Sequence, residues 1–198
     1  MNETFKHFLD RSLAHVVRLN GNPQHFPESV AEHSFYTAYF ASVVLFFLKK
    51  AGEKVDEAKV LKMALIHDVE EGFSGDIVSP FKHFNKEIML AIEKVNEETI
   101  GFMFENLPKE LHNEYLKIWK EESAQDAIES QVVKLADRLS LVSKCYEEMK
   151  VGNTFFTPIY EAELKRIEGI SYPWWQKIKA DIMPRSWWQK IKADIIPG

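Results

Sequence analysis

The fold of this 198-residue chain is decided by one stretch, Asp56-Glu57-Ala58-Lys59-Val60-Leu61-Lys62-Met63-Ala64-Leu65-Ile66-His67-Asp68. Apolar residues recur in it every three or four positions, which predicts a helix with one buried face. The side chains predicted to lie on that face are Val60, Leu61, Ala64 and Leu65. The helix therefore ends on two polar residues, His67 and Asp68, and a glycine-containing segment follows them.

A second helix is predicted directly after the string Ser29-Val30-Ala31-Glu32. This string has the Ser-x-x-Glu form of a capping box, in which each side chain satisfies a free backbone N–H at a helix start. An apolar run continues from there to Leu48, and Gly52 closes the helix. His33 is therefore expected in the first turns of a buried helix.

The rest of the chain also has helical periodicity, and the sequence has no sustained apolar–polar alternation bounded by hairpin turns. We therefore predict an all-α fold, built as a single helical bundle. Further helices are predicted at residues 3–19, 86–105, 109–120, 126–150 and 158–168. Residues 71–80 contain two glycines and a proline, which predicts an irregular loop of the kind that carries substrate contacts on a helical scaffold.

The composition favours one soluble domain. A chain of 198 residues with 45% hydrophobic content can bury one substantial core. The net charge is −5, and acidic and basic residues are interleaved, which argues against a nucleic-acid polymer as partner. The N-terminus lacks an apolar signal core, and the longest apolar run, residues 38–48, is too short to span a bilayer. We expect a cytoplasmic protein without a membrane partner, in which the single cysteine, Cys145, has a packing role.

The C-terminal tail contains a duplication. The segment Trp174–Ile182 recurs letter for letter at residues 187–195. Two copies are too few for a stacked repeat array, which needs about three units. We therefore divide the chain into a helical domain at residues 1–170 and a tail at residues 171–198. Our interpretation is a local duplication; the alternative is an amphipathic Trp/Lys segment that binds a membrane or a partner subunit.

Four residues form a candidate metal site: His33, His67, Asp68 and Asp137. Neighbouring helical residues point about 100° apart, so His67 and Asp68 can face one ion only at a frayed helix end, which the following loop provides. Asp137 lies on an apolar stretch, where a carboxylate is costly to bury without a partner or a metal. Two imidazoles and two carboxylates suit one divalent transition metal ion per chain, Mn²⁺, Fe²⁺, Co²⁺, Ni²⁺ or Zn²⁺. Such an ion can polarise a phosphoryl oxygen, so the predicted reaction is phosphoester hydrolysis.

Three further residues are candidates for the chemistry. Glu71 lies four residues after His67, so its carboxylate reaches the same cluster if the helix continues for one more turn. Arg18, at the predicted end of the first helix, offers a planar guanidinium that can bind a phosphate through two hydrogen bonds. Asp76, on the loop, can accept a hydrogen bond from a sugar hydroxyl. Taken alone, however, the His-Asp pair is weak evidence, and His33 alone could be a core histidine.

Five strings of this sequence resemble the HD-domain phosphohydrolases, and within them the bacterial 5'-deoxynucleotidase-like branch. They occur in order and at family-like spacing between residues 5 and 162, and the ordered set is far more specific than any single string. The strings are Glu28-Ser29-Val30-Ala31-Glu32-His33-Ser34, Ile66-His67-Asp68-Val69-Glu70-Glu71, Gly75-Asp76-Ile77-Val78-Ser79-Pro80, Lys82-His83-Phe84-Asn85 and Lys134-Leu135-Ala136-Asp137-Arg138. On this resemblance, residues 1–170 form an HD phosphohydrolase domain.

The resemblance implies that the four candidate ligands hold the metal ion, that Glu71 is the acid/base residue and that Arg18 orients the phosphate. It also implies a nucleoside pocket, with Asp76 near the sugar 3'-hydroxyl. The residues implied to contact the substrate are Arg18, Leu19, His33, Asp68, Asp76, Ile77, Val78, Ser79 and Asp137. In that family, a deoxynucleoside 5'-monophosphate is cleaved to a deoxynucleoside and inorganic phosphate. The enzymes are commonly homodimers, so a small nucleotide and a second copy of the chain are the expected partners.

One position departs from the family pattern. The deoxynucleotidase branch tends to have a tryptophan directly after the phosphate-orienting arginine, where its bulk helps to reject a ribose 2'-hydroxyl, and this chain has Leu19 there. Selectivity for deoxyribose is therefore open. Two alternative functions are a deoxynucleoside triphosphate triphosphohydrolase and a non-catalytic, metal-stabilised module that binds nucleotides or a protein. The cations that could serve a triphosphate tail are Lys82, Lys86 and Lys134.

Overall fold

The computed structural model describes residues 3–183, and within that range every regular element is helical. The predicted all-α fold is therefore confirmed. The helices are α1 (Glu3–His7), α2 (Val30–Lys50), α3 (Glu57–Ile66), α4 (Glu71–Ser74), α5 (Ser79–Lys82), α6 (Lys86–Met103), α7 (Lys109–Ala124), α8 (Ile128–Lys150), α9 (Thr157–Glu168) and α10 (Pro173–Ile182). Two short 3₁₀ turns, Ser12–Ala14 and Thr154–Phe156, supplement them.

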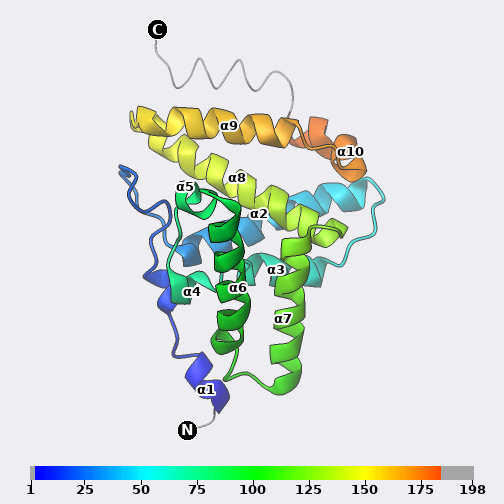
Figure 1. Ribbon diagram of the computed structural model, residues 1–198. Helices are drawn as coiled ribbons and strands as arrows, with labels where there is room; N and C mark the ends of the chain where they lie inside the picture. The colour runs from blue at the N-terminus through cyan, green and yellow to red at the C-terminus, as the bar shows by residue number, and fades with distance from the viewer. Residues whose placement is uncertain (1–2, 184–198) are drawn as a thin grey trace.

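The core of the bundle lies where α2, α3 and α8 meet. Figure 1 shows α8 crossing α2, α9 running beside α8, and α6 and α7 forming a pair on the other side. The predicted capping box starts α2: the Ser29 hydroxyl accepts a hydrogen bond from Glu32 N, and the Glu32 carboxylate accepts one from Ser29 N. In α3, Val60 and Ala64 are fully buried as predicted. Leu65 was predicted on that face but is 53% exposed, and Ile66 is buried instead.

The predicted helix at residues 3–19 is wrong. α1 ends at His7, and the Asp10 side chain accepts a hydrogen bond from Ser12 N, a local contact that favours a turn over a helix. The apolar residues that made the segment look amphipathic remain solvent-accessible: Phe8, for example, is 72% exposed. Arg18 therefore does not end a helix. It lies in an extended segment whose backbone pairs with residues 28–30, and Leu19 has a positive φ of 54°.

The segment at residues 71–80, predicted as an irregular loop, instead contains the two single-turn helices α4 and α5. They are separated by Gly75, whose φ of 73° is readily adopted by glycine but costly for other residues. The residues between the two helices, Gly75–Val78, form the open part of the segment and carry Asp76.

The first copy of the duplicated tail segment forms most of α10, which packs against α2. Trp174 and Trp175 are buried, and Trp174 Nε1 donates a 2.9 Å hydrogen bond to Gln131 Oε1 of α8. Trp175 Nε1 donates to the carbonyl oxygen of Ile167 at the end of α9. The second copy, residues 187–195, lies outside the described residues. Across residues 3–183, no helix has the length and apolar character needed to cross a membrane.

Candidate metal centre and active site

The four predicted ligands converge from three helices. His33 lies in the second turn of α2, His67 and Asp68 follow the last turn of α3, and Asp137 lies in the middle of α8. His33 Nε2 is 3.2 Å from His67 Nε2, 3.5 Å from Asp68 Oδ2 and 3.3 Å from Asp137 Oδ1. His67 Nε2 is 3.1 Å from Asp68 Oδ2. The packing of α2 against α3 thus gathers His33, His67 and Asp68 with their ligand atoms all within 4.8 Å of one another, and α8 adds Asp137 beside His33.

The outer nitrogen of each histidine has a partner that leaves Nε2 facing the cluster. His67 Nδ1 is 2.9 Å from the carbonyl oxygen of Ala64, which can only accept, so Nδ1 donates to it and Nε2, once deprotonated, is the nitrogen available to an ion. His33 Nδ1 is 3.1 Å from Ser140 Oγ on α8. Backbone and hydroxyl partners of this kind fix the tautomer and the ring orientation of metal-binding histidines.

The charges in the cluster favour a cation. Burial works to lower the pKa of His67, but the nearby carboxylates of Asp68 and Asp137 outweigh it and raise that pKa to about 9. Burial likewise works to raise the pKa of Asp137, but Lys134 and the two histidines hold it well below its ordinary value. Two carboxylates that stay ionised beside two imidazoles form a pocket that attracts positive charge.

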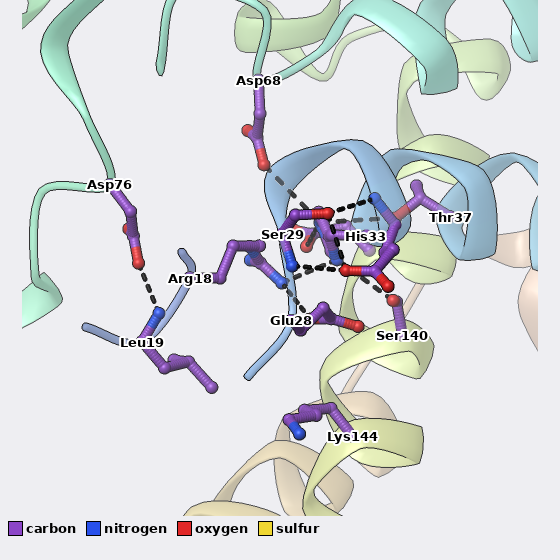
Figure 2. Close-up of polar contacts among 12 residues, drawn as sticks. Arg18, Leu19, Glu28, Ser29, His33, Thr37, Asp68, Asp76, Ser140 and Lys144 are labelled. Atoms are coloured by element: carbon purple, nitrogen blue, oxygen red, sulfur yellow. Dashed lines mark hydrogen bonds and ion pairs between the residues drawn. The ribbon is translucent and has the colours of Figure 1, made fainter. Parts of the chain in front are cut away.

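Arg18 reaches the cluster from the extended N-terminal segment, as Figure 2 shows. Its Nη1 lies 2.6 Å from His33 Nδ1 and 3.4 Å from Glu28 Oε2. Burial alone would lower the pKa of Arg18, but Asp68, Asp137 and Glu28 raise it, so the guanidinium is firmly charged. Although the predicted helix is absent, the structure brings Arg18 to the predicted ligands.

Glu71 lies at the edge of the cluster as the first residue of α4, after a turn that interrupts the helix at Asp68. Its Oε2 is buried without a hydrogen-bond partner. Burial, together with the neighbouring carboxylates of Asp68 and Asp76, raises the pKa of Glu71 to about 9. The side chain is thus a protonated acid at neutral pH, positioned beside charged groups.

Asp76 is tied to the Arg18 segment. Its Oδ2 accepts a 2.5 Å hydrogen bond from Leu19 N, which links the turn between α4 and α5 to the residue after Arg18 (Figure 2). The three residues that follow Asp76 are less engaged: Ile77 is half-buried, Val78 is 41% exposed and Ser79 is exposed. Among residues 3–183, no side-chain contact joins these three residues to the four predicted ligands.

Several polar residues around the site were not singled out from the sequence. Glu28 pairs with Arg18, and Ser140 with His33. Lys134, considered above only for a triphosphate tail, donates a 2.8 Å hydrogen bond to Asp137 Oδ2. Ser140 and Lys134 each lie three residues from Asp137 on α8, so helical spacing was a usable signal for both. Glu28 is paired through tertiary structure, which no local spacing indicates.

Glu70 was also missed. It is buried next to Asp68, and its Oε2 accepts a 2.9 Å hydrogen bond from Trp119 Nε1 of α7. Burial first, and then the charge of Asp68, raise the pKa of Glu70 to about 7. Of these two adjacent glutamates, only Glu71 was singled out from the sequence.

Comparisons with known proteins show a family and a shared fold. Residues 4–185 match the family described as 5'-deoxynucleotidase YfbR-like. A 5'-deoxynucleotidase of Shewanella oneidensis is 34% identical over 130 residues, which cover 65% of this chain and 66% of that protein. The matched region spans about two thirds of the length of such curated relatives.

Solved structures share the fold. A HD-domain phosphohydrolase from Listeria innocua superposes with a TM-score of 0.77 at 24% identity, covering 96% of this chain and 88% of that one. A cyanophage S-2L HD phosphohydrolase, bound to dA and one catalytic Zn²⁺ ion, superposes with a TM-score of 0.60 at 17% identity, covering 97% and 98%. Both likenesses extend over nearly the whole chain and confirm the predicted HD-domain bundle.

Proposed function

This chain belongs to the family of YfbR-like 5'-deoxynucleotidases, and we propose that it is a metal-dependent phosphohydrolase that releases inorganic phosphate from deoxynucleoside 5'-monophosphates. The observation that carries the proposal is the metal-sized group of His33, His67 and Asp68, with Asp137 beside His33 and with Arg18 and Glu71 at its edge. The names of the curated relatives support the same activity.

The donor set fits one divalent transition metal ion. Ligand atoms about 2.0–2.2 Å from an ion lie about 2.8–3.6 Å apart in octahedral or tetrahedral geometry. The separations among His33, His67 and Asp68, and the one from His33 to Asp137, are 3.1–3.5 Å and fall within that range. When bound, the ion supplies Lewis-acid polarisation of a phosphoryl oxygen. The donor types accept Mn²⁺, Fe²⁺, Co²⁺, Ni²⁺ or Zn²⁺, and the Zn²⁺ in the cyanophage structure favours testing zinc first.

Arg18 is the proposed phosphate-binding residue, and its present contact suggests how it becomes available. A neutral imidazole has a single acceptor nitrogen. His33 therefore cannot accept from Arg18 at Nδ1 and bind an ion through Nε2 at the same time. Ser140 Oγ, 3.1 Å from Nδ1, is an alternative partner that accepts the Nδ1 proton. We propose that His33 Nδ1 donates a hydrogen bond to Ser140 Oγ when a metal ion is bound. The guanidinium of Arg18 is then free to bind a substrate phosphate.

Glu71 is the proposed acid/base residue. Its partnerless Oε2 has hydrogen-bonding capacity that the protein does not use. A protonated carboxyl group in that place can give its proton to the leaving 5'-oxygen of the nucleoside, and the resulting carboxylate can later take a proton from water. A purely structural metal site has no need of such a residue, which is why we favour an enzyme over a metal-stabilised binding module.

The sugar is proposed to lie beside Leu19 and Asp76, which are joined by the hydrogen bond from Leu19 N to the Asp76 carboxylate. A 3'-hydroxyl can donate to the Asp76 carboxylate, and the side chain of Leu19 is the group that would meet a 2'-hydroxyl. Ile77, Val78 and Ser79 are proposed to line the rest of the nucleoside pocket, and their open positions leave room for a base. Deoxyribose selectivity then depends on how closely Leu19 approaches the sugar.

The proposed activity is tested by stripping the purified protein of metal, reloading it with Zn²⁺, Mn²⁺ or Co²⁺, and separating the products formed from deoxy- and ribonucleoside mono- and triphosphates. We expect inorganic phosphate and nucleoside from deoxynucleoside monophosphates. Release of inorganic triphosphate would assign the protein to the triphosphohydrolases. Absence of turnover with every substrate and every ion would leave only a binding role.

Two further expectations stay predictions. The chain is predicted to form homodimers, which light scattering on the eluate of a size-exclusion column tests. It is also predicted to work in the cytoplasm, which fractionation of the source cells tests.

A further inference from the structure

One face of α8 that packs into the bundle carries a line of polar residues. Asp137, Ser140, Lys144 and Glu148 follow one another at three- or four-residue spacing, so their side chains lie on the same side of the helix. Ser140 is 1% exposed, Lys144 4% and Glu148 0%. Asp137 and Ser140 belong to the site described above. Lys144 and Glu148, further along α8, have no part in that site.

Lys144 and Glu148 hold a segment of chain on α8. Glu148 accepts 2.9 Å hydrogen bonds from His25 N and Phe26 N and 2.8 Å bonds from Lys144 Nζ and Asn153 Nδ2. Lys144 Nζ also donates to the carbonyl oxygen of Phe26. Each Glu148 oxygen thus has two donors. We call residues 18–28, which run from Arg18 to Glu28 through this anchored point, the Arg18 arm.

The Arg18 arm is a closed loop, so an anchor at its far part affects Arg18. At its base, Arg18 N donates a 2.8 Å hydrogen bond to Glu28 O, and Val17 pairs with Ser29. The anchored Phe26 lies two residues before Glu28, whose carboxylate contacts Arg18 Nη1. Figure 2 shows Glu28 beside Arg18, with Lys144 approaching from α8. Hydrogen bonds and two residues of chain therefore connect Lys144 and Glu148 on α8 to the guanidinium of Arg18.

Attaching a loop through a buried ion pair costs free energy, because two charged groups must be removed from water. Replacing such a pair by apolar side chains of similar volume is often neutral or even stabilising, so stability alone is a weak reason for having it. An apolar contact, however, cannot bind two successive backbone N–H groups and fix their orientation. The Lys144–Glu148 pair does so for His25 and Phe26.

We propose that Lys144 and Glu148 are positioning residues, which hold the Arg18 arm against α8 so that the guanidinium of Arg18 lies at the metal cluster, ready for a substrate phosphate. The inference rests on the proposed function, since it needs Arg18 to bind the phosphate. It assigns to one helix two tasks: Asp137 contributes to the metal cluster, and the Lys144–Glu148 pair sets the distance between that cluster and the phosphate-binding group.

The test compares Glu148→Gln with Glu147→Gln, each made in the wild-type chain and in an Arg18→Ala chain. Glu147 is the matched control because it is the exposed neighbour of Glu148 on the same helix and touches the anchor only through a 3.5 Å contact with Lys144 Nζ. Hydrolysis of a deoxynucleoside 5'-monophosphate and metal content are measured for all of them. In the wild-type chain we expect Glu148→Gln to lower kcat/KM about 10- to 100-fold, mainly through KM and without metal loss. In the Arg18→Ala chain, where no guanidinium remains to be positioned, we expect the same substitution to change kcat/KM less than about twofold.

An equal loss in both chains would mean that Glu148 only supports the fold, and an unchanged kcat/KM in the wild-type chain would equally overturn the inference. Asn153→Ala, which removes an outer bond of the same anchor, replaces Glu148→Gln if that variant does not fold.

Two readouts do not depend on turnover: hydrogen exchange of the His25 and Phe26 amides, and calorimetric binding of inorganic phosphate to the metal-loaded protein. Glu148→Gln should speed the exchange and weaken the binding. If the wild type has no activity but both shifts occur, the proposed reaction fails while the positioning role stands; if neither shift occurs, the positioning role fails.

Discussion

Glu71 and Glu148 carry the same carboxyl group in opposite environments. Glu71 Oε2 is buried without a partner, and burial with two nearby carboxylates raises the pKa of Glu71 to about 9. Glu148 is also buried, which works to raise its pKa, but hydrogen bonds from Lys144, two backbone amides and Asn153 lower it to about 2. Glu71 therefore has a carboxyl oxygen without a hydrogen-bond partner, whereas both oxygens of Glu148 have partners.

The contrast separates the two ends of the polar line on α8. Around Asp137, groups with shifted pKa values face one another across a gap of metal-ligand size, and Glu71 keeps unused bonding capacity. Around Glu148, both carboxylate oxygens and the Lys144 ammonium have partners. Buried polar groups left unsatisfied point to chemistry, because the free energy they cost is recovered only when a ligand binds. Saturated groups point to positioning.

The largest effect is expected at the incomplete end. Asp68→Ala removes one ligand and leaves three, so we expect loss of the metal ion and a fall in phosphate release of about 10³-fold or more. Metal content by mass spectrometry and initial rates check both parts. The folded state, followed by circular dichroism, should persist. A variant that keeps its ion and its activity would show that Asp68 is not a ligand.

Glu71→Gln tests whether Glu71 transfers a proton without binding the metal ion. The amide keeps the size of the side chain but cannot donate an acidic proton. We expect full metal content and a drop in kcat of about 10²- to 10⁴-fold, with little change in KM. Steady-state kinetics on the metal-loaded variant provide the measurement. Loss of metal equal to that of Asp68→Ala would refute the separate role given to Glu71.

Glu148→Gln tests the saturated end through stability. We expect its free energy of unfolding at neutral pH to fall by about 3 kcal/mol, since it breaks a buried ion pair. Glu147→Gln, on the surface, should change it by less than about 0.5 kcal/mol. Urea denaturation of both variants gives the comparison, and equal values would contradict the account of the Lys144–Glu148 pair.

The difference in unfolding free energy between the same two variants is expected to depend on pH. The pKa of Glu148 in the folded protein, about 2, lies below that of an unfolded glutamate, about 4.3. A lowered carboxyl pKa stabilises the fold above the unfolded pKa, and this contribution is lost as the pH falls through the folded value. The gap in unfolding free energy between Glu147→Gln and Glu148→Gln should therefore narrow from pH 5 downward. A gap that stays constant would show that Glu148 is not held in its charged form.

Leu19→Trp is expected to have the smallest effect. It restores the bulky residue that related deoxynucleotidases tend to have after the arginine. We expect the ratio of deoxyribonucleotide to ribonucleotide cleavage to rise about tenfold, because the larger ring leaves less room for a 2'-hydroxyl. Paired kcat/KM values for a deoxynucleotide and its ribonucleotide measure the ratio. An unchanged ratio would place the sugar away from residue 19.

Much of the bundle was predictable because its signals are local. The capping box at Ser29 and the apolar periodicity of α3 and α8 mark helices within a few residues of their observed bounds. The four proposed ligands could be selected from the sequence because each lies on or next to one of these helices. The ordered family strings then joined them into one site.

The Arg18 arm was not predictable in the same way. Residues 3–19 have helical periodicity, but Phe8 and Leu9 find no core to cover them, so the pattern lacks the burial that would stabilise a helix. The actual position of Arg18 depends on backbone pairing with residues 28–30, across a loop that has no hairpin signal in the sequence. The anchor on Glu148 joins residues more than a hundred positions apart, which no periodicity reveals.

The most direct test of the central claim is a titration of metal-free protein with Zn²⁺, in which bound ion per chain and the rate of phosphate release from a deoxynucleoside 5'-monophosphate are followed together. The account predicts that activity rises in proportion to bound metal and levels off at one ion per chain, and that Asp68→Ala stays inactive throughout. Full activity in the metal-free protein, or an ion that binds equally well to Asp68→Ala, would contradict it.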